Sequence, residues 1–319
     1  MATAGTAYEV AELAPGLPFG ATVRGLARDQ LADPAVRQSL VDLWTDKGVL
    51  LFRDGETSRE MQVELSAVFG ELTEFPFKES RSEDDPRLVK IKYFPDDGSC
   101  YEVNGELIGG WIPWHTDMIY FDKINRGGIL RPVQLPPSGG QTGFLDQISA
   151  WESLPQELRE RIEGLHVVYT ADINYANAKF GRPESLKFVQ GAASFLKIMR
   201  RQYEYPRVIH PAVYTQAETG RKVLNVSPGF SDGIFEMGGP EGEALLAEVI
   251  DHCVSQDGAY FHDWEEGDMV LWDNWRVLHC AAGVPADATR IMERTNISGD
   301  YALGRALDGN RDNLPTFDV

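Results

Sequence analysis

Apolar residues recur at helical spacing in two segments near the start of the chain. The first lies between Asp33 and Gly48, with apolar residues every three or four positions after the Asp-Pro start. The second begins at Thr57, where Glu60 completes a capping box, and ends at Gly70. These patterns predict two helices, and the apolar run between them predicts a buried strand.

From about residue 88 onward the pattern changes to short runs of β-forming residues separated by Gly and Pro. The predicted strands cover residues 49–52, 89–93, 119–121, 128–133, 166–170, 223–226, 259–264, 269–272 and 290–297. Helical spacing returns in 147–165, broken at Pro155, and in 240–255. Many short strands with a few flanking helices predict a mainly β fold with helices (α+β), either a sandwich or a barrel.

The length is compatible with one large domain or two small ones. The chain has 319 residues, 43% of them hydrophobic, which is enough to bury a large core. The polar stretches at 79–86 and 94–110 are typical of mobile loops within a domain rather than of linkers. We therefore expect residues 1–319 to form a single domain.

The charge excludes some partners. Thirty Lys and Arg against 49 Asp and Glu give a net charge of −19, so we expect neither nucleic acid nor an anionic membrane as a partner. The three cysteines are widely spaced, so we expect no disulfide framework. The sequence has no apolar stretch long enough to predict a membrane span, and its start lacks the pattern of a signal peptide. We expect a soluble, cytoplasmic protein. The sequence does not predict its oligomeric state, and a homo-oligomer is one of the possible states.

One short motif combines two metal-ligating residue types. In the segment Trp114-His115-Thr116-Asp117, an extended backbone would place His115 and Asp117 on one face, about 7 Å apart. An imidazole and a carboxylate there can converge on one ion. The same tripeptide also fits a loop aspartate bonded to a backbone amide beside a solvated histidine, so the motif alone does not decide.

A third ligand must come from the remaining histidines. These are His166, His210, His252, His262 and His279, of which His279 differs in its context. It follows a predicted strand and is followed by Arg290 and Arg294, which share strand parity and so can face one interior. In a protein this acidic, two inward arginines indicate two anionic groups nearby. Each arginine can instead pair with one of the many carboxylates of the chain.

Taken together in order, these residues resemble the TauD/TfdA family of Fe(II)- and 2-oxoglutarate-dependent dioxygenases. The resemblance covers nearly the whole chain. It is carried by the His115-x-Asp117 motif, by His279 with Arg290 and Arg294 eleven and fifteen residues later, and by four further segments. These are Gly48-Val49-Leu50-Leu51-Phe52-Arg53, Phe69-Gly70-Glu71-Leu72, Leu135-Pro136-Pro137-Ser138-Gly139-Gly140-Gln141-Thr142 and His210-Pro211. Gln141 replaces the acidic residue usual in the family.

The resemblance implies a double-stranded β-helix, the jelly roll of cupin-like proteins. It implies Fe(II) held by His115, Asp117 and His279, the three catalytic residues. It also implies 2-oxoglutarate bound through Arg290 and Thr142, with O2 as the second cosubstrate and succinate and CO2 as products. The expected reaction is oxidation of a C–H bond, usually hydroxylation. Related halogenases lack the carboxylate ligand, so the presence of Asp117 argues against halogenation.

The same resemblance places Arg294 at the position that binds an anionic group of the substrate. The positions that contact taurine in the taurine enzyme carry residues of a different type in this chain, namely Phe75, Lys78 and Trp111. Phe230 retains the aromatic residue that forms one wall of the substrate site. Taurine is therefore a poor candidate. We expect a small to medium organic acid with an apolar body, or a natural-product intermediate.

Two other functions use the same residues. A zinc-type metallohydrolase or lyase would explain the His/Asp/His set but not the spacing of Arg290 and Thr142. A catalytically silent binding protein on this fold would not need the intact set. Two segments are candidate covers of the site: residues 94–110 as a lid, and residues 174–202 as a second wall.

Overall fold

The computed structural model describes residues 8–201, 205–255 and 258–309, and its central feature is a seven-stranded sheet. The strands, in spatial order, are β1 (Glu9–Glu12), β2 (Ala21–Arg24), β3 (Val49–Arg53), β17 (Met269–Asp273), β8 (Gly127–Gln134), β20 (Arg290–Thr295) and β4 (Leu88–Tyr93). Neighbours pair antiparallel except β2 and β3, which are parallel. The sheet thus joins strands from both ends of the described chain.

A four-stranded sheet packs against it. Its order is β16 (Tyr260–His262), β9 (Thr142–Asp146), β18 (Val277–Ala281) and β7 (Ile112–His115). Leu130, Trp272 and Met292 from the large sheet share one apolar cluster with Phe144 and Val277 from the small one. Two facing sheets of mostly antiparallel strands form a jelly-roll core, which confirms the predicted double-stranded β-helix.

Three smaller sheets lie beside the core. One contains β15 (Ser231–Ile234), β10 (His166–Tyr169), β12 (Val208–Pro211) and β21 (Arg305–Ala306). The second contains β11 (Lys187–Gln190), β5 (Cys100–Val103), β6 (Glu106–Gly109) and β19 (Val284–Pro285), and the third β13 (Val213–Thr215) and β14 (Lys222–Leu224). The prediction that 94–110 is loop was wrong for β5 and β6. Asn104 and Gly105 both have positive φ, 53° and 87°, which is the tight hairpin turn that an Asn-Gly pair favours.

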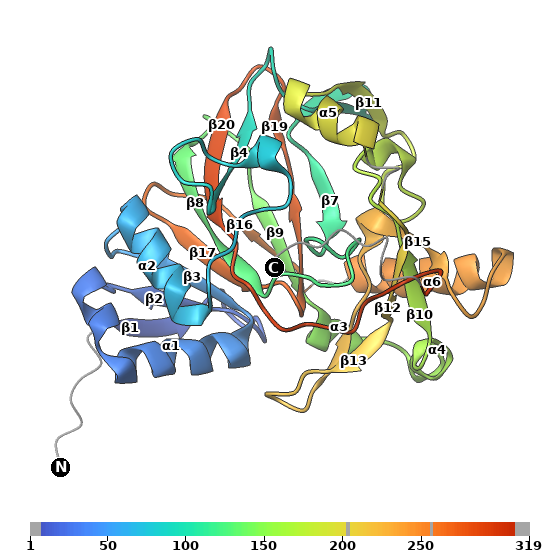
Figure 1. The fold of residues 1–319 in the computed structure, drawn as a ribbon, viewed down its shortest axis with the longest axis horizontal. Helices are drawn as coiled ribbons and strands as arrows, with labels where there is room; N and C mark the ends of the chain where they lie inside the picture. The colour runs from blue at the N-terminus through green and yellow to red at the C-terminus, as the bar shows by residue number, and fades with distance from the viewer. Residues whose placement is uncertain (1–7, 202–204, 256–257, 310–319) are drawn as a thin grey trace.

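Two helices cover the outer face of the large sheet, as Figure 1 shows: α1 (Pro34–Lys47) and α2 (Arg59–Phe69). Residues of β3 alternate accordingly, with Leu50 packing toward the helices and Leu51 toward the second sheet. The predicted cap of α1 is confirmed, because the Asp33 carboxylate accepts a hydrogen bond from Ala35 N at 2.8 Å. The predicted cap of α2 was wrong by one residue: Ser58 Oγ, not Thr57, accepts from Met61 N.

The remaining α-helices are α3 (Gln147–Ser153), α4 (Gln156–Ile162), α5 (Ala193–Arg201) and α6 (Pro240–Val254). Short 3-10 turns are η1 (Arg28–Ala32), η2 (Lys78–Ser80), η3 (Tyr175–Asn177) and η5 (Pro228–Phe230). The predicted break at Pro155 and the predicted helix at 240–255 are confirmed. The strand predicted at 119–121 is instead a turn, which matters for the site below. Within the described ranges, none of the helices is long and apolar enough to cross a membrane.

Candidate active site

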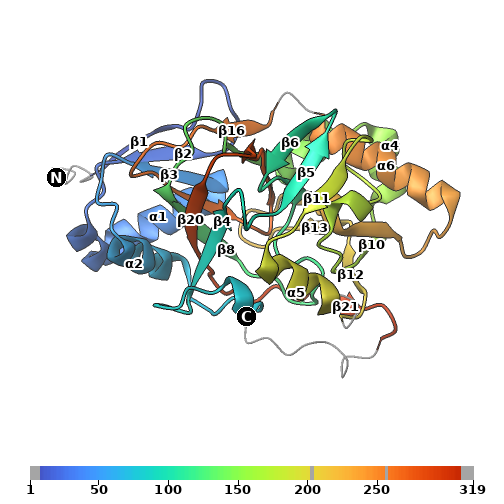
Figure 2. The ribbon, with the colours of Figure 1, turned by 90° about the horizontal axis from the view of Figure 1, so that it is seen from above.

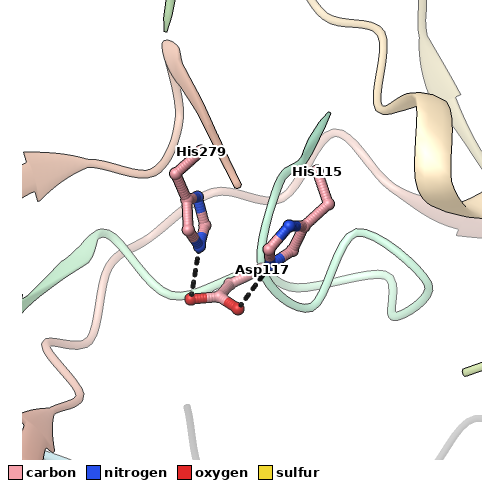
Figure 3. Close-up of side chains that lie close together, drawn as sticks. All are labelled: His115, Asp117 and His279. Atoms are coloured by element: carbon pink, nitrogen blue, oxygen red, sulfur yellow. Dashed lines mark ion pairs between the residues drawn. The ribbon is translucent and has the colours of Figure 1, made fainter. Parts of the chain in front are cut away.

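Two histidines on neighbouring strands face one carboxylate. His115 ends β7 and His279 lies at the centre of β18, and the two are direct partners in the strand register. Their rings are 4.1 Å apart between centroids. Asp117 Oδ1 lies 3.6 Å from His115 Nε2, and its Oδ2 lies 3.5 Å from His279 Nε2 (Figure 3). One ligand atom of each residue thus lies within 4.8 Å of the others, a spacing that suits one metal ion.

Asp117 reaches this position through a turn. The strand β7 ends at His115, and Asp117 is the first residue of a turn over residues 117–120. Asn274 holds the turn: its Oδ1 accepts from Asp117 N at 2.9 Å, and its Nδ2 donates to Asp117 O at 3.0 Å. The next residue, Met118, has a φ of 60°, a strained conformation for a residue with a side chain. The structure therefore holds this carboxylate against backbone preference.

The protonation of the site suits a divalent cation. His115 Nδ1 is 2.9 Å from the carbonyl oxygen of Pro113, to which it can donate, leaving Nε2 free to bind a metal. Burial, followed by the neighbouring His115, lowers the pKa of His279 to about 4, so its imidazole is neutral. Burial alone would raise the pKa of Asp117, but Arg294 and His279 outweigh it and hold that pKa well below its usual value. Two imidazoles and one carboxylate make the facial set typical of non-haem Fe(II) sites.

Two arginines of β20 line the same cavity but differ in their partners. Arg294 forms an ion pair with the Asp117 carboxylate. Arg290 has no carboxylate within 4 Å among the described residues, and its Nε has no hydrogen-bond partner there. Burial alone lowers the pKa of Arg290 to about 10. An unpaired buried guanidinium facing a cavity is a site for an anionic ligand.

Thr142 lies beside Arg290. It begins β9, is 5% exposed, and its Oγ1 accepts from Arg290 Nη2 at 3.4 Å. Thr142 Oγ1 also accepts from Trp264 Nε1 at 3.0 Å. The structure thus places the two residues expected to bind 2-oxoglutarate side by side.

A cavity of about 290 Å³ connects these groups. Aromatic rings form much of its wall. Phe230 lies 5.9 Å from the His115 ring, Tyr175 lies 6.1 Å from Phe230, and Trp111 lies 6.3 Å from Tyr175. Phe75 packs under the Arg294 guanidinium, 5.2 Å from its centre. An apolar wall therefore runs outward from the metal-ligating residues.

The two segments expected to cover the site are bonded to each other. The strand β11 pairs with β5, and Gln190 Nε2 donates to the carbonyl oxygen of Gly98 at 3.2 Å. Asp97 accepts from the backbone N–H of Ala193, the first residue of α5, at 2.9 Å. We call this assembly of residues 94–110 and 187–201 the roof. Figure 2 shows its elements β5, β6, β11 and α5 side by side.

One predicted residue lies elsewhere. Lys78 begins the short turn η2, is exposed, and is not among the residues that line the cavity. Its neighbours Phe77 and Glu79 line the cavity instead. Sequence reasoning missed Asn274 and Trp264, whereas Tyr175 lies in the predicted second wall and lines the cavity. Only Asn274, a polar residue directly after a buried strand, carried a recognisable signal.

The fold and these side chains together define a class: jelly-roll proteins that bind one metal ion through two histidines and a carboxylate. Residues 9–296 match the protein family described as "Taurine catabolism dioxygenase TauD, TfdA family". The chain belongs to this family. It is therefore a dioxygenase, and the family's Fe(II), 2-oxoglutarate and O2 fit the donor set and the unpaired Arg290 described above.

Similar proteins agree with this assignment. The chain is 30% identical over 301 residues to the (S)-phenoxypropionate/α-ketoglutarate dioxygenase of Sphingobium herbicidovorans, covering 94% of this chain and 98% of that protein. It is 29% identical over 282 residues to the α-ketoglutarate-dependent 2,4-dichlorophenoxyacetate dioxygenase of Cupriavidus pinatubonensis, with 86% and 93% covered. A crystal structure titled as a taurine dioxygenase from Burkholderia xenovorans superposes with a TM-score of 0.69 at 26% identity, covering 96% and 93% of the two chains.

Proposed function

We propose that this dioxygenase hydroxylates a carboxylic acid with an aromatic or extended apolar body, of the aryloxyalkanoate type. One observation carries the proposal: a single cavity holds the His/Asp/His set, two buried arginines and an aromatic wall. Both relatives named above are described as acting on phenoxy acids. Taurine has no apolar body to match this wall, and it remains a poor candidate.

Each residue has a proposed task. His115, Asp117 and His279 would hold Fe(II), and Arg290 with Thr142 would bind the distal carboxylate of 2-oxoglutarate. Bound Fe(II), 2-oxoglutarate and O2 supply the oxidising power for breaking a C–H bond, with release of succinate and CO2. The protein orients the substrate and excludes water from the buried cavity.

The substrate would lie between Arg294 and the aromatic wall. Arg294 lines the cavity, its guanidinium carbon is 5.2 Å from the centre of the Phe75 ring, and its Nε has no hydrogen-bond partner among the described residues. Arg294 can therefore donate a hydrogen bond to a substrate carboxylate while it is still bonded to Asp117. Phe230 and Trp111 would contact the apolar body. The exposed position of Lys78 removes it from the proposed substrate contacts.

We also propose that residues 1–319 form one domain that works in the cytoplasm. Strands near both ends of the described chain share the large sheet, which supports one domain. Cys100, Cys253 and Cys280 are buried and unpaired, which supports a reducing compartment.

The reaction class is tested by adding Fe(II) and 2-oxoglutarate anaerobically. We expect a visible metal-to-ligand charge-transfer band in the wild type and its loss in His279→Ala. Absence of the band in folded wild-type protein would contradict the assignment. It would favour the zinc hydrolase, which leaves Arg290 and Thr142 unexplained, or the binding protein, which does not need the intact His/Asp/His set.

The substrate class is tested by oxygen-dependent succinate release with phenoxyacetate, both enantiomers of 2-phenoxypropionate, alkyl sulfates and taurine. We expect the phenoxy acids to exceed the uncoupled background and taurine not to. Arg294→Ala should raise KM for the acid far more than KM for 2-oxoglutarate. Equal weakening of both would reject the role given to Arg294.

A further inference from the structure

The Thr142 hydroxyl oxygen accepts two hydrogen bonds, one for each of its lone pairs. A hydroxyl group has one hydrogen to donate and two lone pairs to accept with. Trp264 Nε1 donates to Thr142 Oγ1 at 3.0 Å, and Arg290 Nη2 donates to the same oxygen at 3.4 Å. Across the described part of the chain, this hydroxyl donates no hydrogen bond. Its hydrogen is therefore left for an acceptor inside the cavity that Thr142 lines.

Trp264 is held in place by its surroundings. The strand β16 pairs with β9 so that His262 lies opposite Thr142, and Trp264 follows two residues later. The Trp264 ring meets the His262 ring edge to face, with centroids 4.6 Å apart. Tyr260 Oη is 2.9 Å from His262 Nδ1, and Asp268 Oδ2 is 3.0 Å from His262 Nε2. The imidazole that supports the indole is therefore fixed on both of its nitrogens.

A buried ion pair fixes the backbone next to Trp264. The Asp268 side chain is 1% exposed and accepts two hydrogen bonds from Arg53, each of 2.7 Å. It also accepts from the backbone N–H of Glu265 at 3.0 Å. Trp264, His262 and Asp268 are not among the residues lining the cavity. Among the described residues, the hydrogen bond that joins these three to a cavity-lining side chain is the one from Trp264 to Thr142.

We propose that Trp264 is a positioning residue for the anionic cosubstrate. Its indole N–H occupies a lone pair of Thr142 Oγ1 and turns the hydroxyl hydrogen toward a carboxylate beside Arg290. Without this bond the hydroxyl is free to rotate and to act as acceptor rather than donor. The inference rests on the proposed function, in which Arg290 and Thr142 bind 2-oxoglutarate.

The test uses Trp264→Phe, which keeps a ring against His262 but removes the N–H. We expect the Kd of the Co(II)-loaded protein for 2-oxoglutarate, measured by calorimetry, to rise about threefold to tenfold, the effect of one hydrogen bond. KM for the substrate and kcat at saturating 2-oxoglutarate should stay unchanged. Trp151→Phe, a buried tryptophan away from the cavity, is the matched control and should leave the Kd unchanged.

A double mutant separates positioning from general packing. In a Thr142→Val background, Trp264→Phe should have no further effect on the Kd, because the hydroxyl through which it acts is gone. An equal loss in both backgrounds, or no loss in the wild-type background, would overturn the proposal. If the part of the proposed function on which this inference rests is wrong, and the protein does not use 2-oxoglutarate, wild-type protein will not bind it at all, so the two failures are distinguishable.

A second measurement leaves Trp264 intact, in case its replacement prevents folding. The chain has seven tryptophans, so ¹⁵N-labelled Zn(II)-loaded protein should give seven indole N–H signals. We expect one signal to shift both on Thr142→Val and on titration of wild-type protein with 2-oxoglutarate. If no signal responds to both changes, the proposal fails.

Discussion

Arg290 and Arg294 lie four residues apart on β20, and among the described residues one of them is paired with a carboxylate and the other is not. Arg294 is paired with the Asp117 carboxylate, whose pKa it keeps low. Arg290 has only the Thr142 hydroxyl as a partner among the described side chains, and desolvation alone lowers its pKa from 12.5 to about 10. That shift corresponds to a cost on the order of 3 kcal/mol for keeping the guanidinium charged in the folded state. A bound carboxylate would offset this cost.

Replacing Arg290 by Met should therefore separate stability from ligand binding. We expect the free energy of unfolding of Arg290→Met to equal or exceed that of the wild type, because the variant removes an unpaired buried charge and keeps much of the volume. The rise in Tm that 2-oxoglutarate gives the wild-type protein should disappear. Thermal denaturation of the wild type and the variant, with and without 2-oxoglutarate, measures the change in stability and the rise in Tm caused by the ligand. A variant still stabilised by 2-oxoglutarate would show that Arg290 does not bind it.

Elements with strong local signals were predictable, and those fixed by distant partners were not. The helix α1 has an Asp-Pro start and a Gly48 stop, and the prediction matched its observed bounds. By contrast, Asp117 reaches its place through a turn whose backbone bonds go to Asn274, 157 residues away. The roof is similar: α5 begins where Asp97, 96 residues earlier, accepts its first N–H. The family resemblance supplied the His115, Asp117 and His279 set, but local periodicity could not supply the turn or the roof.

The Asp97 contact predicts a change at the level of the roof. Asp97→Ala removes the acceptor for the first N–H of α5, which should cost about 1 kcal/mol of local stability. Amide hydrogens of α5 should then exchange about fivefold faster, measured by mass spectrometry, and KM for the substrate should rise. Asp97→Asn keeps an acceptor oxygen without the charge and is the control. If Asn behaves like Ala, the charge of Asp97 matters and the bond to α5 does not.

Asp268 links three strand segments, and its titration predicts how stability depends on pH. Burial alone would raise its pKa, but bonds from Arg53 and His262 lower it from 3.8 to about 2. Because the folded-state value is depressed, the stabilisation is fully present above about pH 4 and is lost as pH falls through 2. We expect Asp268→Asn to lower the free energy of unfolding by about 2 kcal/mol at pH 7, and by about half of that near pH 3. Urea unfolding at both pH values measures the difference, and a pH-independent difference would contradict the assignment.

At the scale of the whole molecule, the net charge of −19 opposes the charge of the proposed ligands. 2-Oxoglutarate and a carboxylate substrate are anions, so the long-range field of the protein repels both. Attraction comes from the cavity itself, where Arg290 and Arg294 lie together with Lys90 and Lys92. The repulsion by the net negative charge therefore acts over long distances, whereas the attraction by the arginines acts at short range. Added salt weakens the first more than the second.

Raising the ionic strength from about 0.01 M to about 0.15 M shortens the screening length from about 30 Å to about 8 Å. This screens the repulsion from surface carboxylates, whereas contacts of about 3 Å with the buried Arg290 are screened little. We expect KM for 2-oxoglutarate to fall over this range, measured at constant pH in two different salts. KM for O2, which is uncharged, should not change and is the control. A KM for 2-oxoglutarate that rises with salt would mean that a positive surface, rather than the buried arginine, draws the ligand in.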